Sequence, residues 1–527
     1  MRGFLFSSAL VFAIACGGNA NHGVDVCSTT IPPPAACMTA CNPQPNAPNT
    51  CPEGFHCDPD GKCNAECLQG SAGSGQCGDG FMCADDGTCI GSGACVGLGC
   101  SVTACAASGK MPTTITGTVF APNGTLPLFG VDVYVPGVDP GSFPAGVQCT
   151  RCADGLPGNP IVQTTTDEMG NFTLAGIPDG PDIPVIISIG KWRREIKIPT
   201  VTPCMSMPVA AADTTLPKSM TDMTPNTTRV DMPQIAITTG NADTLECLVR
   251  RLGVADSEIG TNAGTGHVHL YSGNGVNTFD GGFAGGTGMI PSATPFWSSQ
   301  TNLDNYDIVI LSCEGEQNPD TKPQGAMDAM KAYADAGGRV FMSHWHNIWL
   351  EGATTGGGMG QAPQVWTGVA QFNDSGAAFF GDEDRIDEGG NPKGNSFATW
   401  MLNVGGSAMR DHIVIQGTSQ NDATGKNTVN SISAMATQWV FWTGTTTPNN
   451  GQQAKMNPPQ NFQFETPVEG AADAACGKVV FSDMHVSGNA NGASYPSSCG
   501  GATDLSAQEK ALAFMLFDIA TCVGTIF

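Results

Sequence analysis

The sequence predicts a multidomain chain in which a disulfide-rich N-terminal region and a small β-sandwich precede a doubly wound α/β domain. Three observations predict this order. Thirteen of the 22 cysteines lie between Cys27 and Cys105. Short runs of alternating apolar and polar residues then continue to about residue 204, separated by Gly- and Pro-containing turns. From about residue 229, strand patterns alternate with helical ones, which is typical of a parallel sheet covered by helices.

The composition excludes two classes of protein. The 527-residue chain has 13% charged residues, 69 Gly and a formal net charge of -25. Soluble domains average about 25% charged residues and about 7% Gly. With 40% hydrophobic residues the chain can still build cores, so it is not wholly disordered. The chain has 22 Lys and Arg but 47 Asp and Glu. This excess of acidic residues excludes a nucleic-acid partner, because nucleic-acid binding needs a basic surface.

Residues 1–15 are predicted to be a signal peptide. One Arg precedes Phe4–Ala15, a mainly apolar run of twelve residues that is too short to span a bilayer. The run ends A-I-A-C at Cys16, which resembles a bacterial lipobox with Ala where the family prefers Leu. The resemblance implies that Cys16 is lipidated, that residues 16–50 are a tether, and that the protein is held on the outer membrane or cell surface. The alternative is ordinary cleavage after Ala15 and a secreted protein.

The cysteine count bears on this choice. If Cys16 carries lipid, 21 cysteines remain, an odd number. One of them must then be free or bonded to another chain.

Residues 51–105 are predicted to form a Cys-rich tandem repeat. The pattern C-x-(D/E)-G-F-x-C-x-x-D-G-x-C occurs at 51–63 and again at 77–89. One Phe per copy provides almost no core, so disulfides must hold each copy together. Zinc is not expected, because exported thiols oxidise and C-x5-C is not a short zinc knuckle. The predicted role is a stapled stalk, and its disulfide candidates are Cys51, Cys57, Cys63, Cys77, Cys83 and Cys89.

Residues 112–204 are predicted to form the β-sandwich. Period-two strands begin at Thr114 and Val131, and T-D-x-x-G-x-F-x-L begins at Thr166. This order resembles the carboxypeptidase-regulatory-like (transthyretin-like) domain, which implies a secreted accessory domain without catalytic residues. Cys149 and Cys152 form a C-x-x-C that predicts a local disulfide. The basic segment at 191–197 predicts a solvated strand with a charged edge.

Residues 205–228 are predicted to be a linker, and 229–527 to be the α/β domain with an insertion at about 350–460. Strands are predicted at 234–240, 267–271, 306–311, 339–343 and 478–483, and helices at 244–252, 325–336 and 507–522. Parallel sheets of this kind bind ligands outside the carboxyl ends of their strands.

Two segments of this domain resemble a known family. Y-D-I-V-I-L from Tyr306 and G-G-R-V-F-M-S-H ending at His344 resemble class I glutamine amidotransferase-like, flavodoxin-like folds, and more closely their ThuA-like (trehalose-utilisation) branch. Amidotransferase activity does not carry over, because the G-x-C-x-G turn of the nucleophile is absent at His344 and Cys313 follows an earlier strand. The whole chain also resembles large secreted bacterial lipoproteins built from these three kinds of part.

His, Ser and carboxylate groups follow the predicted strands. The candidate catalytic residues are Glu314, Ser343, His344 and His485, and the candidate metal ligands are His344, His346, His485 and Asp483. In the alternative interpretation these histidines are satisfied core residues, Cys313 pairs with Cys247, and the domain binds no metal or other cofactor.

Two functions follow from these alternatives. The first is a lipid-anchored surface protein with a binding or structural role, its ligand a carbohydrate or a surface protein, and with Cys247 bonded to Cys313. The second is a ThuA-like or metal-dependent hydrolase of extracellular carbohydrate, with Glu314, His344, His346 and His485 in one open cleft. Six tryptophans suit sugar stacking or core packing: Trp345, Trp349, Trp366, Trp400, Trp439 and Trp442.

Overall fold

The chain forms two compact units, residues 1–95 and 96–527. The computed structural model describes residues 26–29, 33–41, 50–52, 55–57, 61–65, 67, 81–83, 87, 89–91, 97–283, 288–354, 361–379, 383–416, 425–447, 451–471, 474–486, 494–500 and 504–524. Cys16, the predicted signal peptide and Cys77 therefore lie outside the described residues. No helix within these described ranges is long and apolar enough to cross a membrane.

The first unit repeats one small hairpin. Strand β1 (His56–Cys57) pairs with β2 (Cys63–Asn64), and β3 (Phe81–Cys83) pairs with β4 (Cys89–Gly91). Each pairing sets the second cysteine of a repeat opposite the third. Three disulfides join its described residues: Cys27–Cys37, Cys41–Cys57 and Cys51–Cys63. Among the described residues of this unit, Phe55 lies in a core of five buried residues, and the disulfides add cross-links to that small core.

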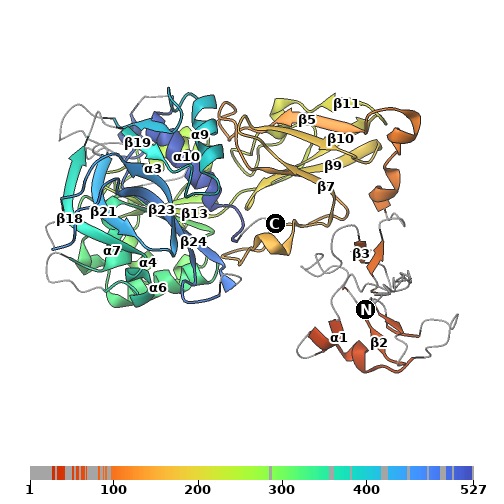
Figure 1. Ribbon diagram of the computed structural model, residues 1–527, viewed down its shortest axis with the longest axis horizontal. Helices are drawn as coiled ribbons and strands as arrows, with labels where there is room; N and C mark the ends of the chain where they lie inside the picture. The colour runs from red at the N-terminus through yellow and green to blue at the C-terminus, as the bar shows by residue number, and fades with distance from the viewer. Residues whose placement is uncertain are drawn as a thin grey trace, which may run out of the picture. The chain divides into compact units, whose positions relative to one another are not determined.

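Two β-sheets begin the second unit (Figure 1). The five-stranded sheet runs in the order β12 (Thr227–Asp231), β10 (Trp192–Val201), β9 (Gly180–Ile189), β6 (Asp132–Pro136) and β7 (Pro160–Thr165). The three-stranded sheet is β11 (Ser206–Pro208), β5 (Thr114–Thr118) and β8 (Asn171–Ala175). Val133 and Ile187 of the first sheet share one hydrophobic core with Ile115 and Leu174 of the second.

The predicted linker at 205–228 is wrong, since this segment begins and ends in strands of these two sheets. It contains β11, the short helix α2 (Ala211–Thr214) and the start of β12. Strand β12 covers β10, so the basic segment at 191–197 is not a solvated edge. Arg194 is 1% exposed and its guanidinium donates to the carbonyl oxygens of Thr215 and Asp222. It therefore holds the segment in place.

A ten-stranded mixed sheet forms the α/β domain. Its order is β14 (Ile259–Gly260), β15 (Val268–Ser272), β13 (Ile235–Thr239), β16 (Ile308–Leu311), β17 (Arg339–Ser343), β24 (Gly477–Ser482), β23 (Pro459–Thr466), β22 (Ala436–Trp442), β19 (Glu383–Ile386) and β20 (His412–Val414). The pairings from β14 to β24 are parallel, and those from β24 to β20 are antiparallel. The predicted insertion thus extends the sheet, and β18 (Ala370–Phe379) pairs with β21 (Gly425–Ile432) beside it.

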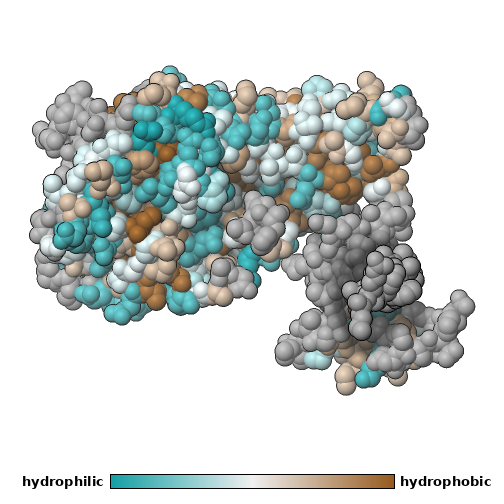
Figure 2. Space-filling view, viewed as in Figure 1, coloured by the Kyte–Doolittle hydropathy of each residue, from teal (hydrophilic) through white to brown (hydrophobic). Residues whose placement is uncertain are grey.

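Helices cover both faces of this sheet (Figure 1). Helices α3 (Leu245–Arg251), α9 (Gly394–Asn403) and α10 (Ala507–Ile519) contribute to one core, which continues into the β-sheets of residues 114–231. Helices α4 (Ala293–Trp297), α6 (Gln324–Asp335), α7 (Ile348–Glu351) and α8 (Gln364–Thr367) contribute to the core of the other face. On the face drawn in Figure 2, hydrophobic residues form small patches among hydrophilic ones.

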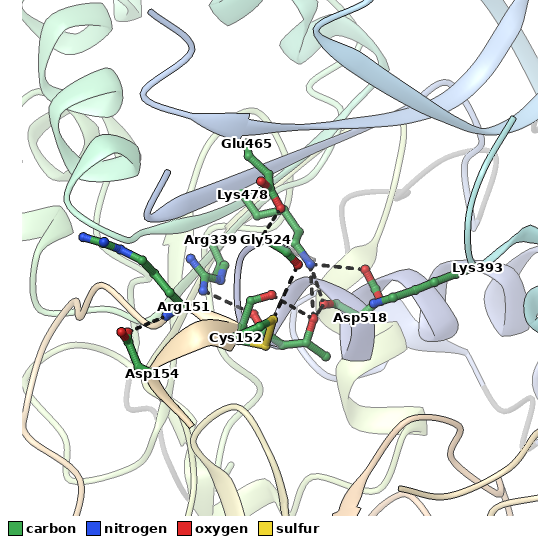
Figure 3. The surroundings of a disulfide bond; sticks show 11 residues. Arg151, Cys152, Asp154, Arg339, Lys393, Glu465, Lys478, Asp518 and Gly524 are labelled. Atoms are coloured by element: carbon green, nitrogen blue, oxygen red, sulfur yellow. Dashed lines mark hydrogen bonds and ion pairs between the residues drawn. A yellow bond between two sulfur atoms is a disulfide. The ribbon is translucent and has the colours of Figure 1, made fainter. Parts of the chain in front are cut away.

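Long-range disulfides join the two parts of this unit. Cys149 bonds to Cys476 and Cys152 to Cys522, so the predicted local C-x-x-C bond is wrong. The backbone explains the pairing, because Arg151 forms a parallel bridge with Val523 and so sets Cys152 beside Cys522. Figure 3 shows this disulfide beside the buried side chains of Lys478 and Asp518. A further bond, Cys105–Cys204, closes the sandwich region.

Candidate functional site

Three residues meet at the carboxyl ends of neighbouring parallel strands. Cys313, His344 and His485 follow β16, β17 and β24, which are adjacent in the sheet. The Sγ atom of Cys313 lies 3.5 Å from Nδ1 of His344. The ring centroids of His344 and His485 are 5.2 Å apart. One potential ligand atom from each residue lies within 4.8 Å of the others. We call these three residues the Cys–His–His cluster.

The backbone at His344 is strained. Its backbone φ is +37°, in the left-handed region that residues other than Gly rarely adopt. This residue begins the turn from β17 into the short 3-10 helix η8 (His344–Asn347). Asp243 braces both sides of the cluster, because it accepts hydrogen bonds from Oγ of Ser343 (2.8 Å) and the backbone N–H of Val486 (2.9 Å). It follows β13, and sequence reasoning missed this role although its strand end is part of the same edge.

The cluster is buried and electrically neutral around pH 7. Burial raises the pKa of the Cys313 thiol to about 12. Burial, together with the charge of Lys426, lowers the pKa of His485 to about 3. The pKa of His344 is also well below its usual range, through burial and then the nearby His485 and Lys426. The chain therefore presents a protonated thiol and two neutral imidazoles.

His346 is a satisfied core histidine. Its Nε2 atom lies 3.0 Å from the carbonyl oxygen of Ser312, and its Nδ1 accepts a hydrogen bond from Nε1 of Trp349 (3.0 Å). Both nitrogens thus have partners, as is usual for a buried polar side chain. The predicted metal-binding role of His346 is not supported by this arrangement.

The candidate carboxylates are also engaged elsewhere. Glu314 forms an ion pair with Lys322, in which Oε2 and Nζ are 2.5 Å apart. Asp483 accepts hydrogen bonds from the backbone N–H and the hydroxyl of Thr428 and from the N–H of Val429. These carboxylates hold loops and strand β21. The predicted open cleft is wrong too, because Glu314, His344, His346 and His485 are each at most 3% exposed.

The expected Cys247–Cys313 disulfide is wrong. Cys247 of α3 bonds to Cys499, and Cys313 is a buried free cysteine among the residues that the structure describes. The thiol of Cys313 instead faces His344. Another group of cysteines in the described chain has metal-like spacing (Cys41, Cys51 and Cys63), but all three are in disulfides.

Most of the tryptophans pack in the core. Trp349, Trp366, Trp400 and Trp439 are at most 1% exposed, so they offer no surface for a sugar ring. Trp345 and Trp442 are partly exposed. Trp345 stacks obliquely on His344, with 4.7 Å between ring centroids. Core packing, the more frequent of the two expectations for the six tryptophans, is therefore confirmed for these four, and the sugar-stacking alternative is wrong for them.

The chain has distant structural neighbours among solved proteins. No family model and no curated protein matches the chain. A ThuA-like protein from Bacteroides uniformis ATCC 8492 shares 10% identity over 54% of this chain and 88% of its own, with a TM-score of 0.25. Two type II cohesin–X-dockerin complexes from Acetivibrio cellulolyticus share 16% and 14% identity over 28% of this chain and 75% of theirs, with TM-scores of 0.14. At such TM-scores these similarities carry no functional argument.

Proposed function

We propose that the chain is an exported, lipid-anchored surface protein whose α/β domain has a binding role and no amidotransferase activity. The disulfides carry the first part of this proposal, export from the cytoplasm. Seven of them join described residues, and three span 252, 327 and 370 positions of sequence. Such cross-links form and persist in oxidising compartments outside the cytoplasm.

The free thiol of Cys313 supports lipidation of Cys16. Of the 22 cysteines, removing these two leaves 20, an even number that can pair completely. Without lipid on Cys16, a second cysteine would need to be free or bonded to another chain.

The strand-end geometry argues against amidotransferase chemistry. A cysteine nucleophile works as a thiolate, which requires a lowered pKa. Burial instead raises the pKa of Cys313, and His344 occupies the strained turn after β17. The chain therefore lacks an activated thiolate at that turn.

Thiol counting and lipid labelling test the proposal together. The full chain, expressed in an exporting bacterium and denatured without reductant, should be alkylated at one position, Cys313, and should incorporate labelled palmitate. The Cys16→Ala variant should lose the label and leave the membrane fraction. The matched Cys313→Ala variant should keep the label and show no free thiol. Alkylation at Cys16 of the wild-type chain would overturn the lipid anchor.

A second candidate is a hydrolase of extracellular carbohydrate, favoured by one observation. Among the described residues neither ring nitrogen of His485 has a hydrogen-bond partner, and it lies at the strand ends where α/β enzymes bind their ligands. The test measures release of reducing sugar from oligosaccharides. His485→Gln should abolish release and His346→Gln should preserve it, whereas equal activity in both variants would contradict a role for the cluster.

A further inference from the structure

We propose that Cys313, His344 and His485 bind one divalent transition-metal ion with the coordination chemistry of zinc. The inference goes beyond the proposed function and does not depend on the lipid anchor. Thiolate and imidazole are the ligands that Zn²⁺ prefers, and three protein ligands leave one position for water or another small ligand. No aspartate or glutamate is part of this cluster, which disfavours the hard cations Ca²⁺ and Mg²⁺.

The spacing of the ligand atoms fits a single coordination shell. With metal–sulfur and metal–nitrogen bonds of about 2.3 and 2.1 Å, a tetrahedral site places sulfur and nitrogen about 3.6 Å apart. The Cys313 Sγ–His344 Nδ1 distance is 3.5 Å. One ligand atom of His485 lies within 4.8 Å of both partners. That atom of His485 is therefore at most about 1.2 Å beyond the tetrahedral spacing.

Unsatisfied ring nitrogens provide an independent observation. His344 and His485 are 3% and 1% exposed, yet Nε2 of His344 and both nitrogens of His485 lack hydrogen-bond partners among the described residues. Leaving a buried polar group unpaired costs about 1–3 kcal/mol. His346, only two residues from His344, has both nitrogens satisfied. The fold thus pairs the neighbouring histidine and leaves the two cluster histidines available for a ligand.

Rigid elements hold the three ligands. Each follows a strand that is paired on both sides, and Asp243 ties the residue before His344 to the residue after His485. Gln508 of α10 also donates to the carbonyl oxygen of His485 (3.0 Å). Residues that orient metal ligands in this way commonly affect affinity 10–100-fold. We assign Asp243 as a positioning residue for the site.

The surrounding charges suit a bound thiolate–metal unit. Asp243, Glu314, Lys322 and Lys426 interact electrostatically with Cys313, and Asp483 interacts with Lys426, so the surroundings hold two positive and three negative groups. A divalent ion bound to one thiolate adds a single net positive charge to this environment. The local charges then balance, which lowers the cost of placing the ion in a buried site. Coordination would also keep Cys313 reduced in a compartment where the other cysteines pair.

Metal analysis of the full mature chain, purified without a histidine tag, tests the site. We expect one Zn²⁺ per chain and, after exchange with Co²⁺, a thiolate-to-cobalt charge-transfer band. Cys313→Ser should abolish the band, and His485→Gln should weaken Zn²⁺ binding more than roughly 100-fold, beyond the range of an orienting residue. His346→Gln should bind one ion with the wild-type band. Asp243→Asn should bind more weakly but keep the band.

Four results would overturn the proposal. The first three are less than one bound Zn²⁺ or Co²⁺ per chain after metal loading of the reduced wild-type protein, a cobalt spectrum without a thiolate band, and unchanged binding in the Cys313→Ser/His485→Gln double variant. The wild-type measurement decides the question even if a variant fails to fold. Displacement of Zn²⁺ by an excess of Mg²⁺ would equally contradict a soft-ligand site.

Discussion

The ammonium of Lys322 lies 2.5 Å from a carboxylate oxygen of Glu314, and neither side chain is more than 4% exposed. The same ammonium lies 4.8 Å from the ring centre of Trp297. A buried ion pair adds little compared with apolar residues, but removal of one partner leaves an uncompensated charge. The stability of the fold with either charge present therefore depends strongly on the presence of the other.

Lys322→Met should destabilise the α/β domain by about 3–5 kcal/mol, because Glu314 would remain buried without its counter-charge. The Lys322→Met/Glu314→Gln double variant should recover a large part of the loss. Thermal melting followed by circular dichroism measures both.

The exposed pair Arg250–Asp256 provides the control. Its side chains are 38% and 40% exposed, so Arg250→Met should change stability by less than about 1 kcal/mol. Equal losses in Lys322→Met and the double variant would contradict the coupling.

Glu246 should make the folded state less stable as the pH rises. It is 1% exposed in α3, and burial, with a contribution from Asp243, raises its pKa to about 8 from the ordinary 4.5. Between these two pH values the folded chain holds a proton that the unfolded chain has lost, so stability falls with increasing pH. Glu246→Gln removes this penalty. At about 1.4 kcal/mol per pKa unit, its advantage over the wild type should grow to several kcal/mol by pH 8 and vanish near pH 4.

Melting temperatures measured across this pH range check the sign. Glu258 is the matched control: burial raises its pKa, but hydrogen bonds with His267 and the N–H of Met220 outweigh burial and lower it overall. Glu258→Gln should therefore destabilise the chain at neutral pH. A Glu246→Gln variant that is less stable than the wild type at pH 8 would show that the carboxylate is satisfied when charged.

Arg194 should protect the segment at 205–228 from proteolytic cleavage. Besides its two carbonyl partners, its guanidinium bonds to Oδ2 of Asp222 and Oγ1 of Thr227. Arg194→Met leaves these acceptors without their donor and should accelerate tryptic cleavage after the exposed Lys218. Lys197→Met, an exposed change on the same strand, should leave the cleavage rate unaltered. Similar rates in the two variants would contradict the role of Arg194.

The strands were predictable because burial on both faces requires apolar residues. The apolar sequences of β16, β17 and β24 predict strands directly. Parallel pairing of these strands then places His344 and His485 at the same edge of the sheet. Their use was not predictable. Sequence spacing does not distinguish the satisfied His346 from His344, because the difference depends on Trp349 and Ser312 in the folded chain.

Long-range partners account for the wrong predictions. Cys152 bonds to a residue 370 positions away, and no local pattern identifies such a partner. Arg194 was expected on a solvated edge because charged residues are mostly exposed, yet β12 returns from a later segment to cover it. Cys313 was likewise expected in a disulfide because most cysteines of exported proteins are paired.

The two bonds Cys149–Cys476 and Cys152–Cys522 should stabilise the second unit in a non-additive way. With one intact, the other closes an effective loop of about fifty residues, which is worth about 4 kcal/mol. With neither intact, a loop of about 120 residues that runs through the Cys247–Cys499 bond is also released, and closing that longer loop costs more entropy. The quadruple Cys→Ala variant should therefore lose more stability than the sum of the two double variants. Melting under non-reducing conditions measures the three losses, and strict additivity would show that the two bonds constrain independent segments.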